Sequence, residues 1–165
     1  MDTLEIINKA LKLEQESREF YLRAVTLSKD EETKKMFRQL ADDELNHYIF
    51  LQRQYASLIC DDTWCDIPEL DQITPIDLKE PIFPKDRQVI EALVEGATLE
   101  DALLFALTTE DKSFNLYRQS AEEAASPEGR QMFMKLAAAE TEHFSRLMTR
   151  YESIYGYPRE ETIGP

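Results

Sequence analysis

The fold of this chain is decided by two stretches of its sequence, Leu40-Ala-Asp-Asp-Glu-Leu-Asn-His47 and Leu136-Ala-Ala-Ala-Glu-Thr-Glu-His143. Each stretch ends in Glu-x-x-His, and residues three positions apart lie on the same face of a helix. One such motif is a weak signal, because helix surfaces produce it often. In this sequence, however, the two histidines of the chain both fall in it. The pattern predicts two helices that each present a glutamate and a histidine towards one point.

Both stretches belong to an internal repeat with an offset of 96 residues. Residues 11–57 align without a gap on residues 107–153, and fourteen of the 47 aligned positions are identical. A self-match at one fixed offset across two helices indicates a duplicated architecture. The matched positions that carry polar or aromatic side chains include Glu14/Glu110, Ser17/Ser113, Tyr21/Tyr117, Glu44/Glu140 and His47/His143.

Helix-breaking residues separate the two halves of the repeat. The first proline is Pro68, the first glycine is Gly96, and four of the seven prolines fall within residues 68–84. Within each half, apolar residues recur every three or four positions, as on one face of a helix, with a break near residues 28–30 and another near Ala125. We therefore predict an all-α fold in one domain over residues 1–165, with an irregular crossover connection over residues 60–85. Two helical hairpins joined in this way make a four-helix bundle.

Several residues mark the expected helix ends. Asp2 with Glu5, Asp30, Thr98 with Asp101, and Ser126-Pro127 are typical of helix starts, and Gly156 followed by Pro158 is typical of a helix end. Residues 86–95 are expected to form one short extra helix.

Composition and charge exclude several classes of function. The chain has 33 Asp and Glu residues against 19 Lys and Arg, a net charge of −14, which argues against nucleic acid as a partner because phosphate binding needs a basic surface. No apolar run reaches the ~18–20 residues of a membrane span, and the N-terminal residues do not resemble a secretory signal. Two cysteines are too few for a disulfide framework, so a cytoplasmic location is expected.

The two cysteines lie close together in the sequence, as Cys60-Asp-Asp-Thr-Trp-Cys65. Two thiols cannot close a tetrahedral zinc site alone. Free thiols are therefore expected, with a redox pair or half of a metal knuckle as the alternatives.

Glu14 and Glu110 are predicted to join the two Glu-x-x-His pairs. Glu14 lies 15 residues before a turn at Lys29 and Glu44 lies 15 residues after it, so antiparallel helices bring them to the same height. The second hairpin does the same for its own glutamates. The six candidate metal ligands are Glu14, Glu44, His47, Glu110, Glu140 and His143.

The charge of these residues favours a metal site over a purely structural cluster. All six lie on the apolar stripes, and burying even one unpaired carboxylate costs several kcal/mol. Two divalent cations would cancel four negative charges, and mixed carboxylate and imidazole ligands suit iron or manganese and admit zinc. A buried salt-bridge network is the alternative interpretation.

The chain resembles the rubrerythrin family of the ferritin-like superfamily. The resemblance rests on Glu14-Gln-Glu-Ser-Arg-Glu-Phe-Tyr21, Leu40-Ala-Asp-Asp-Glu-Leu-Asn-His47, Glu110-Asp-Lys-Ser-Phe-Asn-Leu-Tyr117 and Leu136-Ala-Ala-Ala-Glu-Thr-Glu-His143. It implies a ferritin-like bundle that binds two iron ions. By this resemblance, Glu44 and Glu140 would bridge the two irons, and Glu14 and Glu110 would be terminal carboxylate ligands. His47 and His143 would each bind one iron.

The resemblance also implies an activity and two further residues. Tyr21 and Tyr117 would donate hydrogen bonds to the ligands, although they could also be plain core aromatics. The family reduces peroxide, so the implied function is a non-haem di-iron oxidoreductase acting on hydrogen peroxide or dioxygen. A ferroxidase or iron-storage protein, and a non-enzymatic structural or sensing module, are the alternatives. A homodimer is expected.

Two features depart from the rubrerythrin pattern. A further glutamate usually lies one turn after the third-helix glutamate, but Ser113 stands there, as Ser17 does in the first repeat. This puts in doubt the exchange of a ligand at one iron that accompanies redox change in the family. The sequence also contains no Cys-x-x-Cys knuckles. Electrons are therefore expected from an external rubredoxin-like donor or from ferrous iron.

Overall fold

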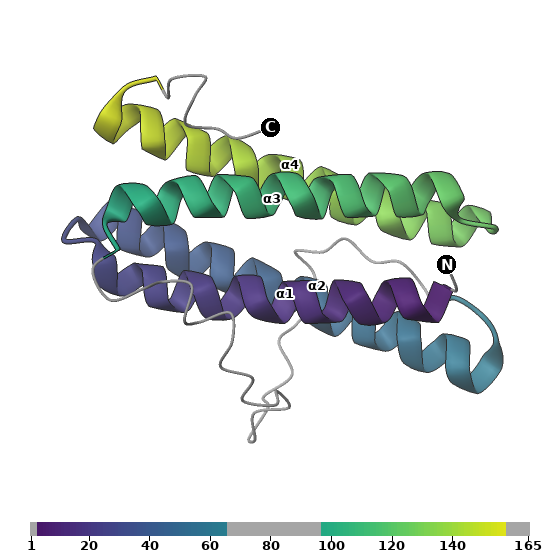
Figure 1. Cartoon of the computed structure of the whole chain (residues 1–165). Helices are drawn as coiled ribbons and strands as arrows, with labels where there is room; N and C mark the ends of the chain where they lie inside the picture. Colours follow the sequence, from purple (N-terminus) through teal and green to yellow (C-terminus); the bar gives the residue numbers. More distant parts are fainter. Residues whose placement is uncertain (1–2, 66–96, 158–165) are drawn as a thin grey trace, which may run out of the picture. The chain divides into compact units, whose positions relative to one another are not determined.

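The computed structural model describes residues 3–65 and 97–157, and this part of the chain is built from helices with no strand (Figure 1). The elements are α1 (Thr3–Ala24), a short 3-10 helix η1 (Val25–Leu27), α2 (Glu31–Asp61), α3 (Leu99–Glu123) and α4 (Pro127–Tyr155). The prediction of an all-α protein with four long helices is confirmed, as are both predicted breaks. The predictions for residues 66–95, Asp2 and Pro158 lie outside the described residues.

The chain divides into two compact units, Met1–Val25 with Lys35–Val94 and Thr26–Lys34 with Glu95–Pro165. In the first unit α1 and α2 run antiparallel. The amide of Asn8 donates to the hydroxyl of Tyr55 over 3.3 Å, and Tyr21 stacks on Phe37 with ring centroids 6.0 Å apart. Because partners late in α1 are early in α2, the two helices must run in opposite directions.

The second unit repeats this arrangement in α3 and α4, which also run antiparallel (Figure 1). The hydroxyl of Tyr151 donates to a carboxylate oxygen of Glu100 over 2.8 Å, and Tyr117 stacks on Phe133 with centroids 6.4 Å apart. The stacked pair is the one found in the first unit, shifted by 96 residues. The internal repeat of the sequence is therefore also a repeat of packing within each hairpin.

Local side-chain hydrogen bonds fix the helix starts where the sequence predicts them. The carboxylate of Asp30 accepts the backbone N–H of Thr33 over 2.7 Å, as an N-cap does. Thr98 and Asp101 form a reciprocal capping box, which lowers the pKa of the Asp101 carboxyl because the backbone N–H and the hydroxyl of Thr98 favour its charged form. Ser126 caps α4 through the N–H of Gly129.

The end of α4 needs a residue that tolerates the left-handed region of backbone space. Gly156 has φ of 81°, and its N–H donates to the carbonyl of Glu152 over 3.0 Å. A side chain at this φ would be strained, which explains why glycine closes the helix.

An arginine from α4 holds the N-terminal turn of α2 within the second unit. The guanidinium of Arg150 donates to the hydroxyl of Thr33 over 2.7 Å and to the carboxylate of Glu32 over 3.0 Å, and it also pairs with the carboxylate of Asp30. The bonds from Thr33 are the main cause, and the charge of Arg150 a further one, of a lowered pKa at the Asp30 carboxyl. The same cap thus starts α2 and ties it to α4.

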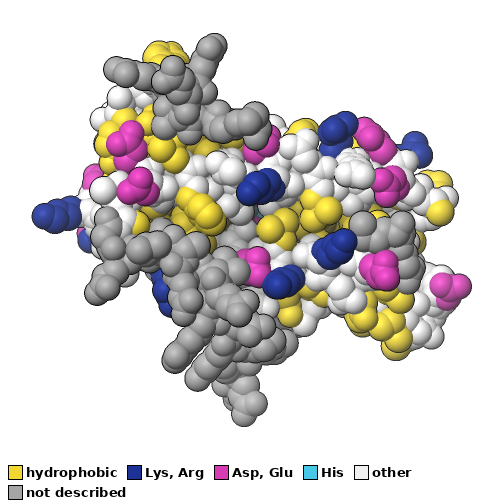
Figure 2. Space-filling model, in the orientation of Figure 1, with side chains coloured by type: hydrophobic (Ala, Val, Ile, Leu, Met, Phe, Trp, Pro, Cys, Tyr) yellow, Lys and Arg dark blue, Asp and Glu magenta, His cyan; other side chains and the backbone are white. Residues whose placement is uncertain are grey.

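Acidic and basic side chains are interspersed over the face drawn in Figure 2, without a continuous basic patch there. Among the described residues, no helix is both long enough and apolar enough to cross a membrane.

The capping box predicts a measurable loss of stability. Replacing Thr98 with Ala removes the hydroxyl that accepts the Asp101 N–H, and we expect the free energy of unfolding to fall by about 1 kcal/mol in urea titrations. Thr108→Ala is the matched control, because that exposed hydroxyl only bonds back to the carbonyl of Leu104. The control should be neutral or slightly stabilising. Equal losses in both variants would contradict the assigned cap.

Candidate metal centre

The first hairpin brings together three of the predicted ligands, Glu14 from α1 with Glu44 and His47 from α2. The Nδ1 atom of His47 lies 3.4 Å from a carboxylate oxygen of Glu14 and 3.3 Å from one of Glu44. Each residue offers one ligand atom within 4.8 Å of the other two. All three are at most 2% exposed. The predicted register of the two helices is therefore observed.

The second hairpin builds the same group from Glu110 on α3 with Glu140 and His143 on α4. The Nδ1 atom of His143 lies 3.6 Å from a carboxylate oxygen of Glu110 and 3.7 Å from one of Glu140. Their exposed fractions are at most 3%. Each distance is within a few tenths of an ångström of its counterpart in the first hairpin, so the duplication extends to the ligand groups.

The donor atoms fit a divalent cation in both kind and spacing. Carboxylate oxygen and imidazole nitrogen are ligands of iron, manganese and zinc. Two ligand atoms that each lie about 2.1 Å from one ion, at a tetrahedral angle, are about 3.4 Å apart. The four measured separations of 3.3–3.7 Å bracket that value. Two ionised carboxylates beside one neutral imidazole would carry net negative charge, which a cation would offset. Each hairpin therefore holds a buried group that can bind a metal ion.

The tyrosines of the predicted site are fully buried in the same hairpins as these groups. Tyr21 and Tyr117 are each 0% exposed and stack on Phe37 and Phe133. Long helical side chains lean towards the N-terminus of their helix, so each ring points back along the stripe that carries the glutamate seven residues earlier. A role for their hydroxyls as donors to the ligands stays a prediction.

Ser113 stands where the rubrerythrin pattern has a further carboxylate, and Ser17 is its counterpart in the first repeat. Both are buried, with exposed fractions of 4% and 3%. The hydroxyl of Ser113 donates to the carbonyl of Thr109 over 3.1 Å, one turn back on its own helix. Ser113 therefore brings no additional charge to the ligand group.

The cysteines are free thiols, as expected. The side chain of Gln54 binds the backbone of Cys65 through two hydrogen bonds of 3.3 and 3.2 Å. Gln54 thereby holds the backbone of Cys65 against α2, six residues before Cys60.

The contacts not predicted from the sequence include those of Arg150, those of Gln54 and the one between Tyr151 and Glu100. Arg150 and Gln54 are equivalent in the repeat. A polar residue on an apolar stripe indicates that a buried polar partner exists. The spacing does not identify that partner when it lies far away in the sequence.

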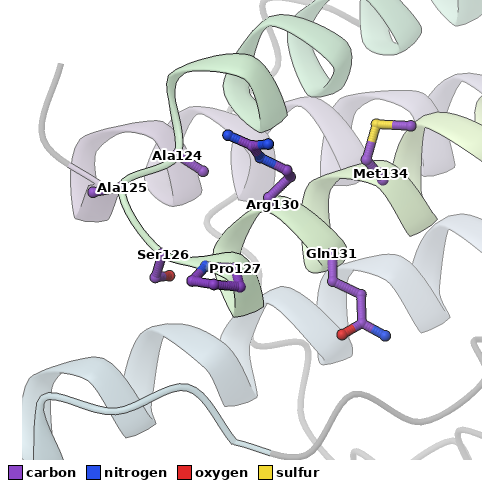
Figure 3. Close-up of a pocket in the computed structure, with 7 residues that line it drawn as sticks. All are labelled: Ala124, Ala125, Ser126, Pro127, Arg130, Gln131 and Met134. Carbon is purple, nitrogen blue, oxygen red and sulfur yellow. The ribbon is translucent and has the colours of Figure 1, made fainter.

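A hollow at the turn between α3 and α4 is separate from the ligand groups (Figure 3). It is lined by Ala124, Ala125, Ser126, Pro127, Arg130, Gln131 and Met134. None of these seven residues is a candidate ligand, and the serine already caps α4.

The sequence profile of the ferritin-like domain family matches residues 2–152. This range includes all six candidate ligands. Comparisons with curated proteins and with solved structures gave no match.

Metal binding should stabilise the fold, because a cation neutralises carboxylates that are buried only when the chain is folded. With free Mn²⁺ at a hundred times its dissociation constant, the gain is about 2.7 kcal/mol, measured as a rise in melting temperature over protein in chelator. Glu110→Gln should reduce the rise. Glu142→Gln should leave it unchanged, because Glu142 lies between Glu140 and His143 in the sequence but is exposed. An identical rise in both variants would contradict the ligand assignment.

Proposed function

The chain belongs to the ferritin-like domain family, and we propose that it is a non-haem di-iron oxidoreductase of the rubrerythrin type, which reduces hydrogen peroxide or dioxygen. The observation that carries this proposal is the buried Glu, Glu and His group that recurs in both hairpins with nearly equal distances. A single structural metal site would not require the duplication. A duplicated group suits a reaction that needs two metal ions and two electrons.

We propose that the two groups together hold two iron ions, with manganese or zinc as possible substitutes. Four carboxylates carry the charge that two divalent cations neutralise. The Glu-x-x-His pairs of α2 and α4 with one glutamate each from α1 and α3 make up the ligand pattern of di-iron carboxylate bundles. In this assignment Glu44 and Glu140 would be the ligands shared by both ions.

When bound, two ferrous ions supply the two electrons that reduction of peroxide to water requires. The protein has three tasks around them. Glu14 and Glu110 would each hold one ion from the opposite helix of their hairpin. His47 and His143 offer Nδ1 towards the carboxylates. The apolar residues that surround the groups exclude bulk water; among them Leu40 and Leu136 are 0% exposed.

Tyr21 and Tyr117 are proposed to donate hydrogen bonds towards the ligands. A buried tyrosine hydroxyl usually finds a polar partner, and these rings are fully buried on the ligand stripe. A donor there would orient a carboxylate and stabilise its charge.

The near equality of the two groups also favours a second candidate function, a ferroxidase or iron-storage protein. Serine at both Ser17 and Ser113 gives the two hairpins the same protein ligands. A symmetric centre suits the oxidation of ferrous iron that arrives as substrate. Light scattering separates the two candidates, because a storage cage would be far larger than the homodimer proposed for the oxidoreductase.

For the oxidoreductase, we propose an external one-electron carrier such as a rubredoxin-like protein as the partner. A reducing compartment such as the cytoplasm is proposed because Cys60 and Cys65 are free. The test is anaerobic turnover of hydrogen peroxide with a reduced carrier, compared with the same protein after chelation. Turnover that persists in the chelated protein would overturn the proposal.

The bridging assignment predicts that one substitution removes both ions. The native protein should bind two iron ions per chain in elemental analysis. Glu44→Ala and Glu140→Ala should each lose both ions and peroxide turnover while keeping their helical circular dichroism. Asp42→Ala is the matched control, since Asp42 is exposed two residues before Glu44. Retention of two ions in either bridging variant would count against the assignment.

The serine at position 113 predicts that the metals keep the same six protein ligands on oxidation and reduction. Ser113 is too short to reach an ion with charge, and its hydroxyl is bonded to Thr109. Ser113→Glu should introduce a ligand that one oxidation state prefers, and Ser120→Glu, just under three turns of helix after Glu110, should not. Crystal structures in both states provide the measurement. An iron shift above about 1 Å in the native protein, at Fe–ligand lengths of about 2 Å, would contradict the prediction.

A further inference from the structure

A line of side chains that ends in two tyrosines follows α4 away from the ligand group of the second hairpin. Residues four positions apart share a helix face, which places Leu147, Tyr151 and Tyr155 in succession after His143. Tyr151 is 3% exposed and Tyr155 is 41% exposed, and their ring centroids are 5.3 Å apart. The eight residues from His143 to Tyr151 span about 12 Å. The line therefore leads from a candidate ligand to the surface.

The first tyrosine of this line has a proton acceptor. The hydroxyl of Tyr151 donates to a carboxylate oxygen of Glu100 over 2.8 Å. This bond is the main reason that the pKa of Tyr151 is raised above its ordinary value. A phenol becomes strongly acidic when it loses an electron. A carboxylate already hydrogen-bonded to it can take the proton at that moment.

The equivalent tyrosine of the first hairpin has a different partner. Tyr55 aligns with Tyr151 in the repeat, but its hydroxyl accepts a hydrogen bond from the amide nitrogen of Asn8 over 3.3 Å. An amide N–H is a donor and cannot take a proton. The chain thus contains its own control, with the same residue at the same helix position next to a different group.

We propose that Tyr151, Glu100 and Tyr155 form a proton-coupled electron relay that carries oxidising equivalents from the interior of the second hairpin to the surface. The source of these oxidising equivalents, a metal ion bound by His143, rests on the proposed function. The chemistry of the relay itself needs only a one-electron oxidant near Tyr151.

The relay moves one electron and one proton at each step. Tyr151 gives one electron to the oxidant and its hydroxyl proton to Glu100, which leaves a neutral phenoxyl radical and a carboxylic acid. Tyr155 then gives one electron to this radical, Glu100 returns the proton to the Tyr151 oxygen, and the Tyr155 proton goes to water. A one-electron reductant in solution, such as a thiol or ascorbate, restores Tyr155.

The relay can be tested on metal-free protein, which separates it from the proposed function. A ruthenium polypyridyl photo-oxidant is attached to a histidine introduced at an exposed position of α4, by Glu142→His. The native histidines do not compete, because they are at most 3% exposed. After a laser flash with an electron acceptor, phenoxyl radicals are followed by transient absorption and electron paramagnetic resonance.

Five variants in this background give distinct expected results. Tyr151→Phe should abolish the fast radical, whereas Tyr55→Phe should leave it unchanged. Glu100→Gln should slow its formation about tenfold, the effect of losing one hydrogen bond to a charged group, whereas Glu122→Gln, on the same helix, should not. In Tyr155→Phe, the radical should persist longer on Tyr151.

The readout distinguishes a relay from a purely structural contact. A structural role would lower the melting temperature of Tyr151→Phe without changing radical formation. Equal radical yields in Tyr151→Phe and Tyr55→Phe would overturn the relay, as would an unchanged radical lifetime in Tyr155→Phe. Circular dichroism checks that each variant remains helical.

Discussion

The structure depends on the burial of four glutamates in helical cores. In each hairpin two carboxylates and one imidazole are almost completely removed from water, with exposed fractions of 1–3%. Such charges destabilise a fold unless a counter-charge meets them, and the full penalty returns if one partner is lost. The apolar stripes, the antiparallel register and the helix caps all serve to hold these side chains at one height. A bound cation would supply this counter-charge to each group.

Local rules explain why much of this arrangement could be predicted from the sequence. The glutamate and histidine of one motif share a face because a helix repeats every 3.6 residues, and Glu14 meets His47 because a tight turn sets the register of α1 against α2. The same spacing places Ile154 on the buried stripe of α4, but it is 39% exposed. Tyr151 pairs with Glu100, so the antiparallel partner of Ile154 would lie near residue 97. Because α3 begins only at Leu99, it does not extend far enough to cover Ile154.

What the sequence could not predict are contacts that join distant residues through polar side chains. Arg150 reaches Asp30 and Thr33, and Tyr151 reaches Glu100. A pattern of spacing gives the face on which such a residue lies but not the partner that it meets. These contacts also differ between the two repeats, whereas the ligand groups do not. Divergence is thus concentrated at the ends of the hairpins, away from the ligands.

This contrast has a chemical consequence. With serine at both Ser17 and Ser113, each hairpin offers the same three candidate ligands, and an ion bound by them would have coordination positions left for exchangeable oxygen ligands. Because the two ligand groups are nearly equal, they do not determine through which hairpin electrons or protons would move. Direction must come from the parts that differ, and the carboxylate beside Tyr151, which the amide of Asn8 replaces beside Tyr55, is such a difference. The proposed relay would thereby give the second hairpin a route for charge that the first hairpin lacks.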